Sequence, residues 1–467
     1  VRIRAVPEGS VVSTHQALVT IESTDTKAYW VPSYIETLLL RLWYPVTVAT
    51  ISWHAKQTIR QFLERTSDDP EAALPFKLHD FGARGVSSAE SAALGGAAHL
   101  VNFMGTDTVS GLMAAKAYYH EPMAGFSIPA AEHSTITSWG REAEVDAYRN
   151  MLRQFAKPGG LVAVVSDSYD IFHAIREHWG KTLKQEVIDS GATVVIRPDS
   201  GDPVAVVHQC LELLDEAFGH TVNGKGYKVL NHVRVIQGDG INPNSIRAIL
   251  ERVTSAGYAT DNVAFGMGGG LLQQVDRDTL GWAMKASSAN VAGEWRDVYK
   301  DPVTSRSKRS KRGRLALVET EQGLQTIREE QLNGRENLLQ PVFRNGELLR
   351  QDRLSDVRAR VGHGMGGRDY IGKQRNIVGI EFFGQQWRIE VFLAQQLAEF
   401  DLGGGVAGLA VFVVRAAREE LPPRRVSPAR NNALVGLVEG VLEVQQRDHD
   451  AQRHARPSGV ACNAYAL

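Results

Sequence analysis

The chain has 467 residues, of which 43% are hydrophobic, and a formal net charge of −1 at pH 7. This length allows one large domain or two to three ordinary ones, and the apolar content is sufficient for a buried core. The near-neutral charge excludes a global electrostatic field that favours nucleic acid or an anionic membrane.

Residues 1–9 contain no signal-peptide core and no Met, so we expect an N-terminally truncated fragment. The longest apolar run, residues 403–414, is too short and too rich in glycine to span a bilayer. The two cysteines, Cys210 and Cys462, are far apart and form no metal or redox motif. Such cysteine usage is compatible with a reducing cytoplasm, and we expect a cytoplasmic protein.

The N-terminal part is predicted to contain strands followed by helices. Residues 1–30 combine turn residues with a β-branched apolar run, which predicts strands. Apolar residues at helical spacing predict a helix over 33–43 that ends before Pro45. A second helix is predicted over 47–64.

Two glycine-containing segments follow and are predicted to be irregular. Residues 77–85 are interpreted as a loop and residues 105–108 as a polar turn. Between them, Ser87 and Glu90 match a capping box, in which Ser87 begins a helix and Glu90 reaches back to it. The small residues of that helix predict close packing.

Residues 127–139 place His133 beside Glu132 in a run of small and hydroxyl side chains. Histidine titrates near neutral pH, and an adjacent carboxylate can hold an imidazolium or orient one ring nitrogen. The alternative is a buried histidine bonded to the backbone. This stretch alone leaves both interpretations open.

From residue 161 the pattern becomes regular. Four short apolar runs alternate with amphipathic segments, which predicts parallel strands buried on both faces. The runs cover residues 161–165, 193–196, 233–236 and 262–265. The helices between and after them are expected at about 169–190, 203–218, 243–256 and 271–280. Polar or glycine residues follow every run, and ligands of such folds bind at the carboxyl ends of strands.

Residues 266–270, Gly-Met-Gly-Gly-Gly, follow the last run. Such a turn allows backbone N–H groups to approach a phosphate, although glycines also serve tight packing. No Gly-Lys-Ser/Thr follows, so it is not a P-loop. Arg277 adds a positive charge nearby. Asp199 and Asp239 suit ribose hydroxyls or a hydrated Mg²⁺.

Phe81 offers a flat ring for stacking, and Arg84 offers a fork for a phosphate. The alternatives are a core residue and a surface salt bridge. Together with the strand-end carboxylates, these groups suit a phosphorylated ribose and a flat ring. Carboxylates also stabilise the oxocarbenium-like state of a glycosyl transfer.

The C-terminal part contains a basic run, a turn and an unassigned tail. Residues 306–314 carry six basic residues, which indicates either a solvated loop or an anion-binding loop. Asn345-Gly346 predicts a tight hairpin within 338–349, and a short helix is expected over 354–360. No catalytic constellation is visible after residue 361.

The chain resembles the nicotinamide phosphoribosyltransferase family, a group of type II phosphoribosyltransferases, in order and over residues 1–361. The resemblance is carried by seven motifs: residues 77–88, 103–108, 129–137, 165–170, 196–203, 235–240 and 265–273. It implies a (β/α) barrel-like α/β fold. Residues 77–285 would form the catalytic domain, and residues 1–76 and 286–361 an accessory region made from both ends of the matched chain.

The resemblance also implies an activity. The family joins nicotinamide to phosphoribosyl pyrophosphate, giving nicotinamide mononucleotide and pyrophosphate in NAD salvage. Its members are homodimers with shared active sites, use Mg²⁺, and take ATP as an activating co-substrate.

Site roles follow from the matching motifs. Phe81 would stack on the pyridine ring, Asp107 would accept a hydrogen bond from the carboxamide, and Arg197 would line the pocket. His133 would be the histidine that ATP phosphorylates. The remaining assignments are a catalytic role for Asp167 and Asp199, ribose contacts of Asp199, Gly238 and Asp239, phosphate contacts of Arg84, Gly268, Gly269 and Arg277, and pyrophosphate or ATP contacts of Lys285, Lys300 and Lys308.

Two differences from the family pattern lead to alternatives. An Asp-Ser-Tyr-Lys stretch, whose tyrosine stacks on the ring from the partner subunit, is absent before Val1. Residues 362–467 do not match the family, and we expect low order there. The alternatives are a nicotinate phosphoribosyltransferase, a truncated non-catalytic remnant that binds nucleotide, and an unrelated barrel enzyme acting on a sugar phosphate.

Overall fold

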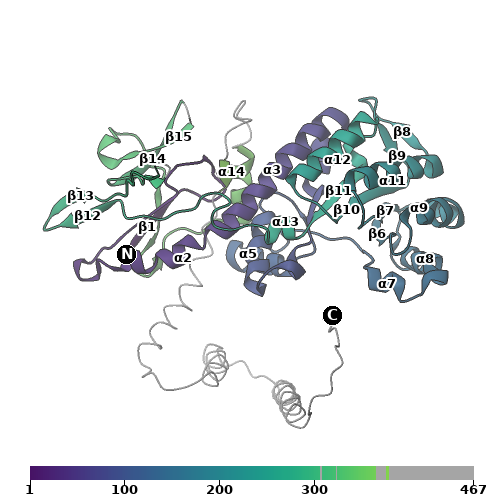
Figure 1. Cartoon of the computed structure of the whole chain (residues 1–467), viewed down its shortest axis with the longest axis horizontal. Helices are drawn as coiled ribbons and strands as arrows, with labels where there is room; N and C mark the ends of the chain where they lie inside the picture. The colour runs from purple at the N-terminus through teal and green to yellow at the C-terminus, as the bar shows by residue number, and fades with distance from the viewer. Residues whose placement is uncertain (306–307, 322, 364–374, 378–467) are drawn as a thin grey trace, which may run out of the picture. The chain divides into compact units, whose positions relative to one another are not determined.

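The fold contains a parallel six-stranded sheet, which lies in the right half of Figure 1. The computed structural model describes residues 1–305, 308–321, 323–363 and 375–377. Every neighbouring pair in this sheet is parallel. The strand order is β5 (Gly105–Thr106), β4 (Leu78–Asp80), β11 (Val263–Met267), β10 (Val233–Gln237), β7 (Thr193–Arg197) and β6 (Leu161–Val165). This arrangement confirms the predicted α/β barrel-like class.

The sheet curls, and residues 126–131 hydrogen-bond to both of its edges. The Thr106 N–H donates to the Phe126 carbonyl at 3.0 Å on the β5 side, and the Ala131 N–H donates to the Ala163 carbonyl at 2.9 Å on the β6 side. Ala163, Val195 and Ile236 on three strands form an apolar cluster against which Ile128 and Phe81 pack. Strand ends that are distant in sequence therefore meet around one mouth.

Helices cover the outer face of the sheet, and local caps set where several begin. Asp202 caps α11 (Pro203–Phe218) by accepting the Ala205 N–H, and Asn242 caps α12 (Pro243–Ser255) by accepting the Asn244 and Ser245 N–H groups. α3, α11 and α12 lie side by side in Figure 1. α3 covers Trp43–Thr66, and the other helices of this layer are α5 (Ala89–His99), α6 (Val109–Tyr119), α8 (Glu144–Phe155) and α10 (Lys184–Ser190).

A second, four-stranded sheet joins the two ends of the matched region. Its order is β17 (Glu347–Leu348), β16 (Gln340–Arg344), β1 (Arg2–Ala5) and β3 (Val19–Glu22). Asn345 and Gly346 form the predicted hairpin turn, with φ of 48° and 97°. Both residues tolerate the left-handed region, which fixes this turn.

Several local predictions were wrong, and tertiary pairing explains two of them. Residues 78–80 and 105–106 are strands β4 and β5, because β11 supplies ladder partners to β4 and β4 supplies them to β5. Pro45 lies in the first turn of α3, where its missing N–H is not required. The helix cap near residue 87 is Ser88, which accepts the Ser91 N–H.

Three predicted helices are shorter or divided. The segment at 33–43 forms α1 (Val31–Tyr34) and α2 (Glu36–Leu40). The segment at 169–190 is interrupted by a π-helix, Ala174–Thr182. The glycine turn opens only α13 (Gly269–Leu272).

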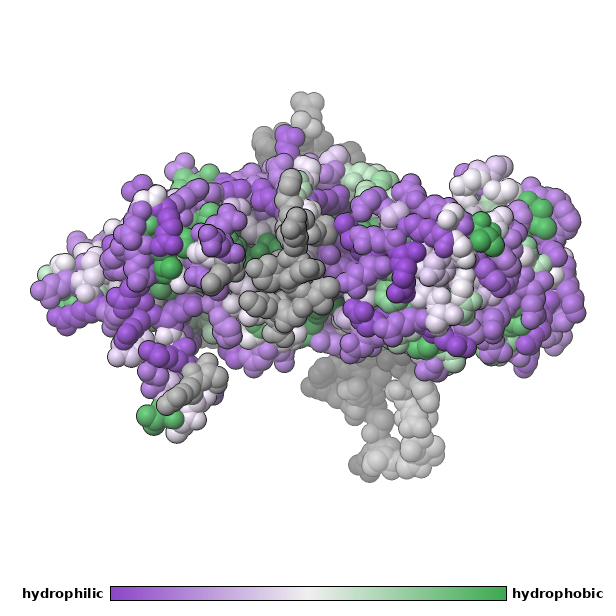
Figure 2. Space-filling view, turned by 90° about the horizontal axis from the view of Figure 1, so that it is seen from above, coloured by the Kyte–Doolittle hydropathy of each residue, from purple (hydrophilic) through white to green (hydrophobic). Residues whose placement is uncertain are grey.

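The prediction of low order in residues 362–467 lies outside the described residues, apart from two pieces. α14 (Leu354–His363) includes the first two residues of that range, and β18 (Arg375–Ile377) pairs with β2 (Val11–Ser13). None of the helices in the described ranges combines the length and hydropathy needed to cross a bilayer. The face shown in Figure 2 is predominantly hydrophilic, with apolar residues scattered over it.

Candidate active site

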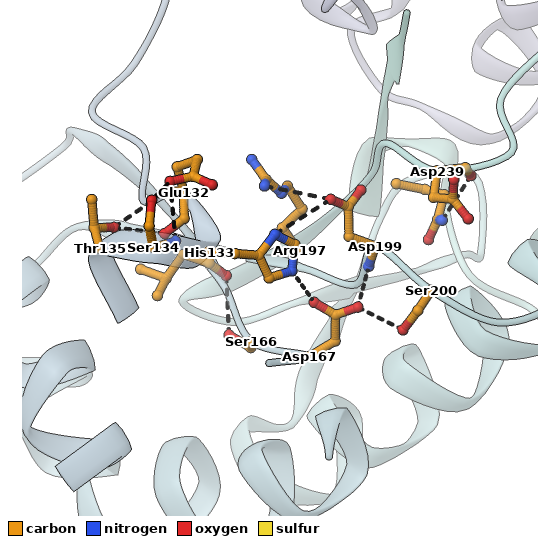
Figure 3. Close-up of polar contacts among 12 residues, drawn as sticks. Glu132, His133, Ser134, Thr135, Ser166, Asp167, Arg197, Asp199, Ser200 and Asp239 are labelled. Atoms are coloured by element: carbon orange, nitrogen blue, oxygen red, sulfur yellow. Dashed lines mark hydrogen bonds and ion pairs between the residues drawn. The ribbon is translucent and has the colours of Figure 1, made fainter. Parts of the chain in front are cut away.

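Charged side chains gather at the carboxyl ends of β6 and β7 (Figure 3). Asp167 follows β6, Arg197 ends β7, and Asp199 lies two residues further on. His133 begins α7 (His133–Thr137), whose N-terminus is capped by Glu132. Parallel strands that end at one edge explain why residues from separate motifs come together.

Asp167 orients His133. The His133 Nε2 lies 3.0 Å from Asp167 Oδ1, and the Asp167 side chain is only 4% exposed. The other carboxylate oxygen accepts the Asp199 N–H at 3.0 Å and the Ser200 hydroxyl at 2.6 Å. An acceptor so firmly held places the proton of a neutral His133 on Nε2. The opposite nitrogen, Nδ1, then keeps its lone pair.

Asp199 lies between positive and negative neighbours. Its Oδ2 is 3.9 Å from His133 Nδ1 and 3.6 Å from an Arg197 guanidinium nitrogen. Burial raises the pKa of Asp199, Arg197 opposes that increase, and Asp167 adds to it. Arg197 Nε is buried and has no hydrogen-bond partner among the described residues. The guanidinium therefore keeps a donor that a bound ligand can use.

Phe81 lies against glycines at the ends of the neighbouring strands. A Cβ added to Gly266 would be 2.0 Å from the Phe81 ring, which no side chain tolerates. A Cβ added to Gly238 would lie 3.5 Å from the ring and 3.0 Å from Asp199 Oδ1. These glycines make room for the ring and place it beside the carboxylate of Asp199.

Asp107 follows β5, next to the strand that carries Phe81. Its N–H donates to the Asp80 carbonyl at 3.0 Å, and its Oδ1 accepts the Ser127 hydroxyl at 2.5 Å. Asp107 is exposed. No hydrogen bond is made to its second carboxylate oxygen within the described residues, so this oxygen can accept one from a ligand at this mouth.

The residues predicted to bind phosphate, and Asp239, predicted to bind ribose, lie at the same edge of the sheet but make fewer contacts with the cluster. Gly268 precedes α13, and a Cβ there would be 3.4 Å from the Phe81 carbonyl, whereas one at Gly269 would meet only Gln274. Arg84 is exposed in the turn after Phe81. The remaining two are Asp239, exposed after β10, and Arg277, which pairs with Asp278 at 2.8 Å.

The three predicted lysines lie outside the cluster. Lys285, Lys300 and Lys308 are exposed in the segment around β12 (Ser288–Val291) and β13 (Glu294–Asp297). Lys285 approaches Glu36 at 3.7 Å. Within the described ranges, no hydrogen bond or ion pair connects these lysines to His133, Asp167 or Asp199.

Sequence reasoning missed two residues that support this site. Ser200 holds Asp167 from the residue after Asp199, and its position next to a strand-end aspartate was the available signal. Asp80 was hidden in a segment interpreted as a loop, although it is fully buried at the end of β4.

The sequence of the chain matches known proteins over most of its length. A sequence model of the "Nicotinate phosphoribosyltransferase (NAPRTase) family" matches residues 76–347. The chain is 71% identical over 365 residues to "Nicotinamide phosphoribosyltransferase" of Xanthomonas campestris pv. campestris (strain 8004), covering 77% of this chain and 78% of that protein. It is 35% identical over 385 residues to the protein of the same name from Acinetobacter baylyi (strain ATCC 33305 / BD413 / ADP1), covering 77% and 75%.

The fold is also found in a solved structure, that of nicotinate-nucleotide pyrophosphorylase from Pyrococcus furiosus. The TM-score is 0.52 at 16% sequence identity, and the match covers 78% of this chain and 79% of that one. An identity this low indicates a shared fold alone. The family match and the two closely related sequences place the chain itself in the nicotinate phosphoribosyltransferase family.

Proposed function

We propose that this chain transfers the phosphoribosyl group of phosphoribosyl pyrophosphate to nicotinamide, giving nicotinamide mononucleotide and pyrophosphate in NAD salvage. The observation that carries the proposal is the 71% identity to a protein named for this reaction. The geometry supports it, because the Phe81 ring, on which a nicotinamide ring could stack, lies beside the Asp199 carboxylate, which could contact a ribose.

The reaction breaks the bond between the anomeric carbon and pyrophosphate and forms one to the ring nitrogen of nicotinamide. The ring would stack on Phe81, with Arg197 beside it and Asp107 accepting from the carboxamide. Positive charge would develop on the ribose as pyrophosphate departs, and the Asp199 carboxylate, beside Phe81 and Arg197, would stabilise that charge. Gly238 and Asp239 would hold the ribose hydroxyls.

The phosphate groups of the substrate would be bound by glycines and cations at the same edge. Gly268, Gly269 and Arg277 would hold the 5′-phosphate, and Arg84 would add a second cationic contact. Backbone N–H groups next to glycines can approach phosphate oxygens closely. Arg277 would exchange its exposed pairing with Asp278 for the substrate.

Mg²⁺ fits this site as a companion of the substrate. No group of three or more metal-binding side chains is gathered within the described ranges. Burial is the main cause of the raised pKa of Asp199, and Asp239 adds a smaller contribution, so the two carboxylates lie near each other. One or two carboxylates with substrate phosphates are the usual Mg²⁺ environment. When bound, the ion would neutralise the departing pyrophosphate.

ATP would act through His133. Asp167 occupies Nε2, so Nδ1 is the nitrogen with a lone pair for the terminal phosphoryl group of ATP, and ADP would leave. The His133 side chain is 40% exposed, which gives ATP access. Phosphorylation would place negative charge beside Asp199 and thereby couple ATP hydrolysis to turnover.

We also propose a cytoplasmic homodimer with shared active sites. Lys285, Lys300 and Lys308 are exposed and have no contact with the cluster described above. In a homodimer these lysines would meet the pyrophosphate or ATP bound at the partner's site. Light scattering combined with sedimentation would test the dimer, which a monomer at working concentrations would contradict.

The proposed reaction is tested by incubating the purified chain with nicotinamide, phosphoribosyl pyrophosphate and Mg²⁺. We expect nicotinamide mononucleotide and pyrophosphate to appear in equal amounts. Binding of the substrates without product would instead favour the non-catalytic remnant.

A second candidate is transfer to nicotinate, which the name of the matching family favours. The exposed carboxylate of Asp107 argues against it, because it would face the carboxylate of nicotinate. Like charges in contact cost several kcal/mol in recognition. Nicotinamide carries an NH₂ donor at the same position and suits the acceptor.

A further inference from the structure

Asp80 is a buried carboxylate directly before Phe81. It is 0% exposed at the end of β4. Its Oδ1 accepts the Gly82 N–H at 2.7 Å, and its backbone carbonyl accepts the Asp107 N–H at 3.0 Å. One residue therefore holds both the turn that carries Phe81 and the loop that carries Asp107.

The second oxygen of this carboxylate faces another buried polar group. Asp80 Oδ2 and Thr108 Oγ1 are both buried, and neither makes a hydrogen bond of standard geometry within the described residues, although the Thr108 hydroxyl lies close enough to stabilise the carboxylate. A Cβ on Gly96 would be 2.9 Å from the Thr108 methyl and 3.4 Å from Asp80 Oδ2. Helix α5 therefore encloses the pair and restricts any movement of it.

Burying a carboxylate without a full set of hydrogen bonds lowers the stability of the fold, so a role other than stability is expected for Asp80. Burial raises the pKa of Asp80 to about 6, the Gly82 N–H and then the Thr108 hydroxyl oppose the increase, and Asp107 adds to it. The Tyr44 side chain of α3 also lies close: burial is the main cause of its raised pKa, and the Asp80 carboxylate is the second cause. A neutral amide or a hydrophobic residue would fill this space at lower cost.

We propose that Asp80 is a positioning residue that sets the separation between Phe81 and Asp107 and thereby the fit of the nicotinamide ring. This inference rests on the proposed function. Phe81 contacts one face of the ring and Asp107 reads its carboxamide, so an error in their spacing weakens ring binding. The proposed ribose residues, Asp199, Gly238 and Asp239, follow β7 and β10, whereas the Asp80 side chain bonds to the Gly82 N–H. Arg84 lies in the same turn as Phe81, but its long, exposed side chain can follow a small shift of the turn and keep its phosphate contact.

The test compares Asp80→Ala with Asp80→Asn in steady-state kinetics. Asp80→Ala removes the acceptor for Gly82, and we expect the KM for nicotinamide to rise about tenfold while that for phosphoribosyl pyrophosphate stays within about twofold. Asp80→Asn keeps an oxygen for Gly82 and should restore the nicotinamide KM to within about threefold of the original enzyme.

Asp215→Asn is the matched control. Asp215 is a mostly buried carboxylate that accepts from Lys228 and Tyr258, both at 3.0 Å, away from the strand-end cluster. Asp215→Asn should lower the Tm without changing the KM for nicotinamide more than the KM for phosphoribosyl pyrophosphate. A purely structural role for Asp80 predicts the same behaviour for Asp80→Ala, and that result would overturn the proposal.

Thr108→Val covers the case in which Asp80→Ala does not fold. It removes only the hydroxyl that faces Asp80, and Thr108 makes no side-chain cap to α6. We expect the nicotinamide KM alone to rise about twofold to threefold. Equal changes in both KM values would contradict the positioning role.

Hydrogen–deuterium exchange separates this proposal from the reaction itself. In the unliganded protein, Asp80→Ala should accelerate exchange at the Gly82 amide, which loses its side-chain acceptor, whereas Asp215→Asn should leave exchange there unchanged. If the original enzyme made no nicotinamide mononucleotide, the proposed reaction would be wrong. The exchange measurement would still show whether Asp80 holds the turn that carries Phe81. Unaltered exchange at the Gly82 amide would refute the positioning role of Asp80.

Discussion

The orientation of His133 by Asp167 separates its two ring nitrogens. Nε2 is held at 3.0 Å by a carboxylate that also accepts from Ser200 and the Asp199 backbone. We predict that His133→Ala abolishes stimulation by ATP, because no acceptor remains for the phosphoryl group. Basal synthesis should stay within about threefold, since ring and ribose contacts are unchanged. Initial rates with and without ATP provide the measurement, and intact stimulation would refute a phosphohistidine.

Asp107 discriminates between an amide and an acid by its charge. Replacement by Ser removes the repulsion of nicotinate and weakens the acceptor for nicotinamide. We predict that Asp107→Ser narrows the ratio of kcat/KM for the two substrates by about tenfold, equivalent to about 1.4 kcal/mol. An unaltered ratio would show that Asp107 does not read the carboxamide.

Asp80 makes the stability of the fold depend on pH. Burial raises its pKa from 3.8 to about 6, so the folded state binds this proton more tightly than the unfolded state. The free energy of unfolding contributed by Asp80 therefore falls as pH rises through that window and is constant above it.

We predict that Asp80→Asn shifts the Tm upward relative to the original chain between pH 4 and pH 7, because the amide does not ionise. The change is on the order of 1–3 kcal/mol in the free energy of unfolding. Tyr44 and Asp107, the other titratable groups beside Asp80, are the same in both proteins. Thermal melts across this range test it, and a constant difference in Tm would contradict it.

At the scale of elements, the end of β11 is shaped to accept Phe81. A Cβ at Gly266 would meet the ring at 2.0 Å, whereas one at Gly238 on the neighbouring strand would stay 3.5 Å away. We predict that Gly266→Ala costs about 1–3 kcal/mol in stability and most of the activity, because the ring must leave its position. Gly238→Ala is the matched control for stability and should lower the Tm less; its kinetics are not a control, because Gly238 is proposed to contact the ribose. Equal effects on the Tm would mean that Phe81 is not held by this strand.

The elements differ in how well the sequence predicts them. β6, β7, β10 and β11 are short, mostly apolar runs and were recognised, as were the helices over 203–218 and 243–256. β4 and β5 have three and two residues, so no periodicity identifies them. Their strand conformation depends on pairing with partners far away in the chain.

At the scale of the whole matched region, parallel topology made most of the cluster predictable. Asp167, Asp199 and Asp239 follow recognised strands, so the rule that ligands bind at strand ends indicated them. The pairing of His133 with Asp167 links residues 34 positions apart and depends on how residues 126–131 cross the sheet edges. No local pattern encodes that contact. The functions of the three lysines stay predictions, because these residues lie outside the cluster.

The central claim, that nicotinamide is the ring acceptor, is tested most directly by competition. The purified chain is given equal concentrations of nicotinamide and nicotinate with limiting phosphoribosyl pyrophosphate and Mg²⁺, and both mononucleotides are quantified by chromatography. Our account predicts that nicotinamide mononucleotide predominates. A predominance of nicotinate mononucleotide would contradict it.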